Sequence, residues 1–296
     1  MSVGPEAAPS APVEQPGRRA RREQNRRHAR RRRRVSVVGV IGELLITTGA
    51  IVLLFIAWQL WISEYLVGNE VKQQAGELSE QWNTRAAQSP TPSSSPDPSE
   101  TPEPTATPDP AETSEPAGST VVPVGTAPAT ATDFAILIVP RWGADYARTI
   151  AEGVGTAEVL DKGKLGHYPG TQMPGEVGNF AIAAHRMGHG GSLHHINELQ
   201  LGDHIYVETD AGWYEYQFRN LEYVRASGIG VLDAVPQSPE TPATERYITL
   251  TSCNPQYTSR ERIIAYGVFE RFYPRDPAAA HNGAPDEIAA TVDGAA

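Results

Sequence analysis

The sequence predicts an all-β domain, a closed or nearly closed antiparallel β-barrel with short helices, preceded by one transmembrane helix. Residues 132–275 are the stretch with enough apolar side chains to form a core, and their length of about 140 residues suits one domain. This stretch holds many short β-branched runs and few helical patterns, which is typical of antiparallel barrels. An apolar run at residues 35–62 supplies the transmembrane helix.

Six segments of the predicted domain have the composition of β-strands. They are residues 134–139, 179–184, 204–209, 213–224, 247–252 and 263–271. Gly212 closes a predicted hairpin turn between the third and fourth of these. Two short helices are also expected, one at residues 192–199 with Ser192 as its N-cap and one within residues 144–159.

The apolar run at residues 35–62 is long enough to cross a hydrocarbon core of about 30 Å. Trp58 and Trp61 lie at its far end, where interfacial aromatic residues are expected. Its only charge is Glu43, which the run tolerates near the headgroups; pairing with a partner helix is the alternative. A cleaved signal peptide is the rival interpretation, but the residues after the run make a poor cleavage site.

The charge of the chain is divided unequally. Residues 1–34 contain eleven arginines and three acids, a net charge of +8, whereas the whole chain carries −10. A basic tail beside a membrane span contacts anionic lipid and holds the N-terminus in the cytoplasm, which places the folded domain outside the cell. Residues 35–296 contain fourteen basic and thirty-two acidic residues, a net charge of −18. This negative charge argues against a nucleic-acid partner.

Three further segments are predicted outside the core. Residues 63–88 are polar with irregularly spaced apolar positions, which suggests a continued helix or a short coiled coil. Residues 89–131, rich in proline, serine, threonine and acids, predict a disordered stalk that would lift the domain off the membrane. Residues 276–296 predict a disordered tail.

Cys253 is the only cysteine of the chain and ends the β-branched run 247–253. A lone cysteine outside the cell has no intramolecular disulfide partner, and on composition alone a buried core thiol is the simpler interpretation. His185 ends a predicted strand, and Arg262 begins another nine residues after Cys253. This pattern favours a thiol nucleophile with a base and a charge stabiliser over a buried thiol, a carbonyl-bound histidine and a solvated arginine.

These residues resemble the sortases, the cysteine transpeptidases of Gram-positive surfaces. The family signature is a histidine that ends one strand, a Thr-Leu-x-Thr-Cys strand end and an arginine on the next strand; here these fall on His185, residues 249–253 and Arg262. The Tyr-Pro-Gly-Thr segment and the Asn-Phe-Ala-Ile-Ala-Ala-His-Arg strand look most like class E, the actinobacterial housekeeping group. Arg260 has the same strand parity as Arg262, and the family spacing favours Arg262.

The resemblance covers residues 133–273 and implies a sortase-type barrel of about eight strands. It implies that the Cys253 thiolate attacks the Thr–Gly carbonyl of a sorting signal of the LAxTG or LPxTG type and forms a thioacyl enzyme. His185 would protonate the leaving amine, and Arg262 would stabilise the oxyanion or bind the substrate backbone. The amine of a lipid-linked peptidoglycan precursor would then resolve the intermediate.

The resemblance also implies a substrate groove with Tyr168, Thr251 and Ser252. Tyr168 matches the tyrosine that the family associates with alanine at the second position of the signal; otherwise it is a packed turn residue. Ser252 stands where the family usually has threonine, and it keeps the hydroxyl group.

Other functional classes stay open. His185, His189, His194 and His195 lie within eleven residues and are of a type that binds metal ions. The glycines between them predict a loop, and the sequence has no HExxH or Cys/His zinc spacing, so we expect no metal, no stoichiometric transition-metal ion and no other cofactor. The alternatives are a membrane-anchored extracellular binding or metal-binding module without transpeptidase activity, and a cysteine hydrolase that uses water as its acceptor.

Overall fold

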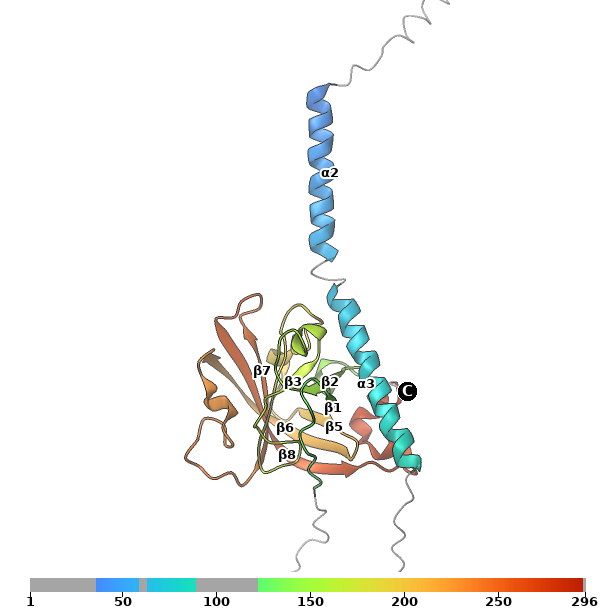
Figure 1. Cartoon of the computed structure of the whole chain (residues 1–296), viewed down its shortest axis with the longest axis vertical. Coiled ribbons are helices and arrows are strands. Elements are labelled where there is room, and N and C mark those ends of the chain that lie inside the picture. The colour runs from blue at the N-terminus through green and yellow to red at the C-terminus, as the bar shows by residue number, and fades with distance from the viewer. Residues whose placement is uncertain (1–35, 59–62, 89–121, 295–296) are drawn as a thin grey trace, which may run out of the picture. The chain divides into compact units, whose positions relative to one another are not determined.

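The structure is a computed structural model that describes residues 36–58, 63–88 and 122–294 (Figure 1). It contains two compact units, Met1–Ile56 and Ala57–Ala296. The predicted basic tail at residues 1–34 and most of the predicted stalk, residues 89–121, lie outside the described residues.

The first unit contains helix α2, Val37–Ala57. Within the described residues, Val37–Ile56 is the stretch that is long and apolar enough to cross a membrane. Its side chains are largely exposed, as expected for a helix that packs against lipid. By length and composition, α2 can serve as the membrane anchor expected at residues 35–62.

The second unit is built on eight strands that close into a barrel in the order β1-β2-β3-β4-β7-β8-β6-β5. The strands are β1 Asp133–Ile138, β2 Ala147–Glu152, β3 Leu165–His167, β4 Gly178–Ala183, β5 His204–Glu208, β6 Gly212–Arg225, β7 Arg246–Asn254 and β8 Glu261–Pro274. The predicted closed barrel of about eight strands is confirmed. It is mixed rather than fully antiparallel, because β2 pairs with β3 and β4 pairs with β7 in parallel.

The predictions of two short helices in the domain are wrong. Residues 144–159 contain β2, whose pairing with both β1 and β3 overrides the local helical pattern, followed by a 3₁₀ turn at Leu160–Lys162. Residues 192–199 form turns with one 3₁₀ segment, Ile196–Glu198. Ser192 does not cap a helix, because its hydroxyl donates to the carbonyl of Gly163 instead.

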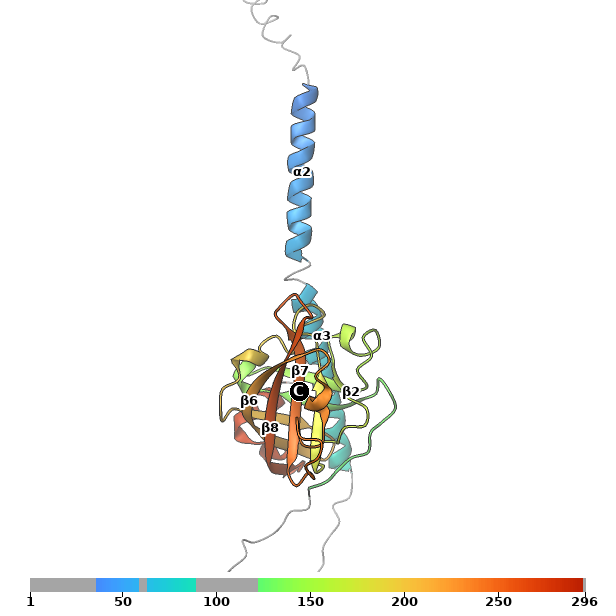
Figure 2. The same ribbon diagram turned by 90° about the vertical axis from the view of Figure 1, so that its left-hand side faces the viewer.

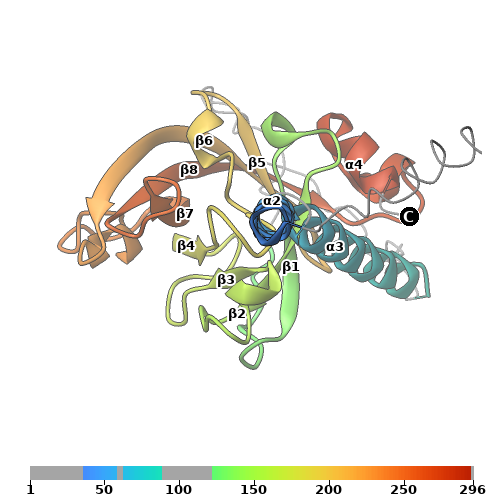
Figure 3. The same cartoon turned by 90° about the horizontal axis from the view of Figure 1, so that it is seen from above.

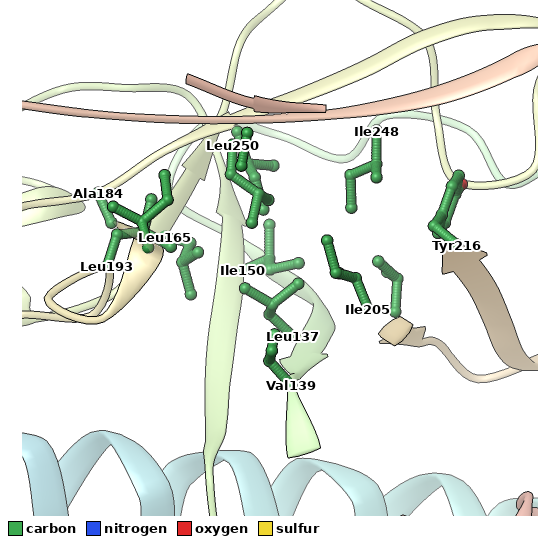
Figure 4. Close-up of a cluster of buried hydrophobic side chains, with 14 of the residues drawn as sticks. Leu137, Val139, Ile150, Leu165, Ala184, Leu193, Ile205, Tyr216, Ile248 and Leu250 are labelled. Carbon is green, nitrogen blue, oxygen red and sulfur yellow. The ribbon is translucent and has the colours of Figure 1, made fainter. Parts of the chain in front are cut away.

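The core fills the barrel interior with side chains from alternate positions of the strands (Figure 4). Leu137 and Ile150 are fully buried there, and so are Ile248 and Leu250 of β7. Each such side chain contributes roughly 1.5–3 kcal/mol by leaving water. Because successive side chains of a strand point to opposite faces, this core fixes which residues of β4, β7 and β8 face outward.

Helix α3, Ser63–Gln88, and the C-terminal segment pack on the outside of the barrel, on the same side of it (Figure 3). Ala75 and Trp82 of α3 join Ile136 and Ile138 of β1 in a second apolar cluster. The guanidinium group of Arg275 lies 5.6 Å from the centre of the Trp82 ring and donates to a Glu208 carboxylate oxygen at 2.7 Å. Helix α3 is therefore part of the folded unit.

The C-terminal segment contains η6 Ala280–Gly283, η7 Asp286–Ile288 and helix α4 Ala289–Asp293. The prediction of a disordered tail at residues 276–296 is wrong for the described residues, which end at 294. Ala284, Ile288 and Val292 are buried in the same cluster as α3. All three belong to one apolar cluster with β1 and α3, so the segment covers apolar surface of the folded unit.

This packing changes what residues 89–121 connect. The segment begins after α3 and ends before Val122, and both neighbours belong to the same compact unit. In the chain, residues 58–62 join α2 to α3. The length of the proline-rich segment therefore does not set the tether between the membrane helix and the barrel, unlike the spacer expected from the sequence.

Candidate active site

Strands β4 and β7 bring His185 and Cys253 to the same place. They run in parallel, and Ala183 is paired with Thr251 at the end of β4. The pairing continues, because the Ala184 amide donates to the Thr251 carbonyl at 3.2 Å. Two residues beyond this register, the chains reach His185 and Cys253. The two catalytic candidates therefore lie beside each other at the end of a parallel pair.

Both side chains lie on the outer face of the barrel. Ile248 and Leu250 of β7 point into the core, so Thr251 and Cys253 point outward. By the same alternation Ala184 points inward and His185 outward. Figure 2 shows β7 between its neighbours on this side of the molecule.

His185 and Cys253 share a cavity of about 270 Å³. Its other lining residues are Arg186, Met187, Pro255, Tyr257, Thr258 and Ser259. Cys253 is a free thiol and is partly exposed. A nucleophile and a base thus open onto one solvent-accessible space, as acyl transfer to a peptide requires.

Arg262 is paired directly with Cys253 in the antiparallel register of β7 and β8. Its Nη1 donates to the carbonyls of Ser259 and Glu261, each at 3.0 Å. Both contacts use the same nitrogen, which leaves Nε and Nη2 for another acceptor. Arg260 lies in the loop before β8 and has no such place opposite the thiol.

Asp161 is a contact that the sequence did not reveal. His185 Nε2 donates to Asp161 Oδ1 at 2.8 Å. Asp161 lies in the 3₁₀ turn after β2, 24 residues before the histidine, and no local spacing connects the two. The carboxylate fixes the orientation of the imidazole and leaves Nδ1 as the nitrogen for proton transfer.

The predicted histidine cluster divides into two pairs. The His185 and His189 rings stack with centroids 5.0 Å apart and planes at 29°. His194 and His195 contact each other edge to face at 4.7 Å, and His195 Nδ1 lies 2.8 Å from a carboxylate oxygen of Glu198. Of the first pair only His185 lines the cavity shared with Cys253, and His189 lies outside that lining. The second pair lines a separate cavity.

Arg186, another lining residue, received no role from the sequence. It is only 7% exposed, yet no carboxylate pairs with it among the described residues. It donates to the side-chain oxygens of Asn254 and Asn197, and its Nε is buried without a partner. A buried cation without a counter-ion is costly, so it leaves positive potential available to a ligand in the cavity.

Of the three residues expected in the substrate groove, Ser252 lies on a different face of the sheet from Tyr168 and Thr251. Tyr168 Oη and Thr251 Oγ1 are hydrogen-bonded at 3.1 Å, on the face that leads to Cys253. Ser252 points to the opposite face, is 3% exposed and donates to the Ala184 carbonyl at 2.8 Å. Tyr168 and Thr251 thus meet on the outer face that also carries Cys253, whereas Ser252 holds the end of β4 against β7. Substrate binding by these three residues stays a prediction.

A larger cavity, of about 470 Å³, lies near the β5–β6 hairpin and the end of α3. Trp82, Phe134 and Tyr214 line it together with the carboxylates of Asp133 and Asp210. It has no cysteine, histidine or arginine in its lining. Because acyl transfer needs a nucleophile and a base, the smaller cavity at Cys253 is the better candidate.

Comparison with known proteins identifies the family of this chain. The family model described as Sortase domain matches residues 137–270. The sortase SrtE2 of Streptomyces coelicolor is 30% identical over 240 residues, which are 79% of this chain and 82% of that protein. This chain belongs to the sortase family. The resemblance to sortases drawn from the motifs is confirmed.

Two further relatives support the assignment. The sortase SrtE1 of Streptomyces coelicolor is 33% identical over 254 residues, 84% of this chain, although the chain spans only 60% of that protein. The SrtA sortase from Actinomyces oris aligns with a TM-score of 0.53 and 35% identity, covering 57% of this chain and 94% of that one. The names SrtE1 and SrtE2 agree with the predicted similarity to class E.

Proposed function

We propose that this sortase is a membrane-anchored transpeptidase that cleaves the Thr–Gly bond of a sorting signal of the LAxTG or LPxTG type. It then transfers the new acyl group to the amine of a lipid-linked peptidoglycan precursor. The observation that carries the proposal is the convergence of His185 and Cys253 on one cavity, with Arg262 opposite the cysteine. Membership in the sortase family makes acyl transfer the reaction that this convergence serves.

In the first step the Cys253 thiolate attacks the threonine carbonyl carbon, and the C–N bond to glycine breaks. The glycine amine leaves with a proton from the His185 imidazolium, so the enzyme holds a thioester. Asp161 accepts from His185 Nε2 at 2.8 Å, which keeps the ring in place and stabilises the imidazolium. Asp161 therefore acts as a positioning residue.

Two arginines supply positive charge where the carbonyl oxygen becomes negative. Arg262 Nε and Nη2 are available to that oxygen or to the substrate backbone. Arg186 adds a fixed charge in the cavity wall, and a fixed charge needs little reorganisation during the reaction. In the second step an acceptor amine attacks the thioester carbonyl, releases the Cys253 thiolate and gives its proton to His185.

Tyr168 and Thr251 line the groove for the signal in this proposal. Their hydroxyl groups bond each other at 3.1 Å, on the outer face next to the thiol. The resemblance to the family associates a tyrosine at this position with alanine as the second residue of the signal. We therefore expect LAxTG to be the better of the two signals.

Helix α2 anchors the enzyme in the cell membrane as its single span. The arginines of residues 1–34 keep the N-terminus in the cytoplasm, so the barrel works outside the cell. No nucleic acid is expected to bind the acidic folded unit. The partners are signal peptides of surface proteins and a membrane-held acceptor.

Intact mass spectrometry of the detergent-solubilised full chain tests the proposal. The full chain is needed because α3 and the C-terminal segment share a buried cluster with the barrel. We expect incubation with LAxTG peptide to add the mass of the peptide up to threonine, and an amine acceptor to convert this adduct into an amide product. Cys253→Ala should form no adduct because it lacks the nucleophile.

Three results would contradict the proposal in different ways. Turnover by Cys253→Ala would exclude the thioacyl mechanism. Cleavage that gives free acid even at high amine concentration would favour the cysteine hydrolase. No adduct with either peptide, from a chain with a cooperative unfolding transition, would favour the membrane-anchored binding module.

A further inference from the structure

We propose that Asp161, His185 and His189 form a binding site for a divalent transition-metal ion such as Zn²⁺, and that the bound ion inhibits the enzyme. The binding stands on geometry alone, whereas the inhibition rests on the proposed function of His185. Two imidazoles with one carboxylate form a common ligand set for zinc, with water in the remaining position.

The ligand atoms are spaced as one ion requires. His185 Nε2 lies 2.8 Å from Asp161 Oδ1, and His189 Nε2 lies 3.7 Å from the same oxygen. The ligand atoms of the three residues all lie within 4.8 Å of one another. Zinc bonds of about 2.0–2.2 Å at tetrahedral angles put ligand atoms roughly 3.3 Å apart, which falls between the two measured distances.

The tautomer of His189 favours a cation at this point. Its Nδ1 donates to the backbone carbonyl of Asp161 at 3.0 Å, because a carbonyl can only accept. The neutral ring therefore carries its lone pair on Nε2, which faces the Asp161 carboxylate. A metal ion between these two acceptors would turn their repulsion into two bonds. Histidine ligands of metals typically donate their other nitrogen to a backbone carbonyl in this way.

The loop that carries His189 has a left-handed backbone and contacts helix α3. Four consecutive residues, from Gly188 to Gly191, have positive φ angles of 71°, 49°, 83° and 50°. Helix α3 packs against this loop, since a Cβ atom on Gly190 would lie 3.1 Å from a methyl group of Val67. This contact and the hydrogen bonds of both imidazoles to Asp161 hold the three ligands near one another, which lowers the cost of ordering them around an ion.

Metal binding is incompatible with proton transfer by His185. To bind the ion, Nε2 must offer a lone pair, so its proton moves to Nδ1 or into solvent. The Nδ1 nitrogen of the bound ring then cannot accept the thiol proton, and the ion opposes formation of the imidazolium. Transfer should stop while the ion is bound and resume when a chelator removes it.

The histidines alone did not predict this site. The expectation of no stoichiometric transition-metal ion considered four histidines of one segment, and His194 and His195 lie outside the set. Asp161 enters from the turn after β2, and only the fold brings it to His185 and His189. The proposed ion is a reversible inhibitor, so the resting enzyme needs no resident metal.

Titration calorimetry with ZnCl₂ tests the site directly. We use the detergent-solubilised full chain with Cys253→Ala, which removes thiolate binding as a complication. We expect one site per chain, and His189→Asn should weaken it at least about tenfold. Asparagine suits the left-handed backbone at this position, where φ is 49°. His194→Asn is the matched control and should bind as the parent does.

The same substitution tests inhibition in the chain with Cys253 intact. Zn²⁺ should inhibit peptide transfer, EDTA should restore it, and His189→Asn should retain transfer while losing the sensitivity to zinc. Equal binding by the parent and His189→Asn in calorimetry would overturn the site. Equal inhibition of both enzymes would show that zinc acts elsewhere, for example on the thiolate, and would overturn the regulatory role. A chain that processes neither peptide contradicts the proposed function, and calorimetry then decides the site alone.

Discussion

His185 and His204 both contact carboxylates, but they are built for different tasks. His185 meets one carboxylate, Asp161, through Nε2 and shares a cavity with Cys253. His204, at the start of β5, meets carboxylates through both nitrogens: Nδ1 lies 2.6 Å from Glu287 and Nε2 lies 3.7 Å from Glu270. A histidine with one nitrogen left for a nucleophile can transfer protons, whereas one held on both sides is better suited to hold structure.

The surroundings of His204 join the barrel to the C-terminal segment. Glu287 comes from η7, whereas Glu215 and Glu270 come from β6 and β8. The Tyr206 hydroxyl oxygen lies 2.8 Å from a Glu215 carboxylate oxygen and 2.7 Å from one of Glu287, so its single proton is shared between them. Burial lowers the pKa of His204, but the hydrogen bond and charge of Glu287, with Glu215 and Glu270, outweigh it and raise the pKa overall. The cationic ring thus bridges carboxylates that otherwise repel.

The largest difference between the two histidines should be in the rate of transfer. We expect His185→Ala to lower the transfer rate by about 10²–10⁴-fold, the usual contribution of general acid–base catalysis. His204→Ala should keep the rate per folded molecule within a few-fold and reduce thermal stability. Single-turnover kinetics of the full chain, normalised to folded protein, measure both. Equal losses of rate would remove the distinction.

Each of the two sites also has an arginine, which extends the comparison. Arg262 is paired with Cys253, whereas Arg219 lies 3.9 Å from Glu270 in the His204 cluster. Loss of one oxyanion donor costs roughly 10²–10³-fold, so Arg262→Ala should lower kcat/KM by that factor. Arg219→Ala and Arg260→Ala should change it by a few-fold at most. A larger loss in Arg260→Ala than in Arg262→Ala would reassign the role.

Replacing the carboxylate that contacts each histidine should have a smaller effect on the rate of transfer. Asp161 orients His185 without touching substrate, so Asp161→Asn should lower kcat by roughly 10- to 100-fold and leave KM nearly unchanged. Glu287→Gln, the matched change at His204, should leave kcat unaltered. Steady-state kinetics with EDTA present separate this effect from metal binding. An increase in KM at constant kcat would show that Asp161 supports substrate binding instead.

Elements that depend on local side-chain patterns could be predicted from the sequence, whereas elements that depend on pairing between distant segments could not. β-Branched alternation located β1 and β4 to β8, because their inner faces fill the core. It missed β3, which has three residues, and β2, because pairing on both sides determines that strand. The packing of Ala284, Ile288 and Val292 was missed because they lie in an alanine- and proline-rich tail without a regular element long enough to recognise.

The residues of the candidate active site divide in the same way, into those that the motif predicts and those that only the fold brings near the thiol. The motif placed Cys253, His185 and Arg262, whose relation follows from strand ends and register. Asp161 and Arg186 gain their relation to the thiol from tertiary contacts, a turn after β2 and the burial of one guanidinium group. Strand parity, which is readable from the sequence, puts Ser252 on the opposite face of β7 from Thr251 and Cys253.

The smallest expected effect concerns stability and pH. The pKa of His204 is higher in the folded protein than the unfolded value of about 6.5. Its contribution to the free energy of unfolding is therefore complete below about pH 6.5 and is lost as pH rises through the folded pKa. We expect the contribution to be about 0.5–1 kcal/mol, because partly exposed ion pairs are weakened by solvent.

Urea unfolding of the full chain and of His204→Gln at several pH values isolates the contribution of the His204 charge to the free energy of unfolding. The difference in free energy of unfolding between the two proteins should be largest near pH 6, fall by pH 8 and shrink in high salt, because salt screens exposed charges. Glu287→Gln should reduce the pH dependence as well, since it removes the nearest carboxylate. A difference that stays constant from pH 6 to pH 8 would mean that packing of the His204 ring, rather than its charge, holds the C-terminal segment on the barrel.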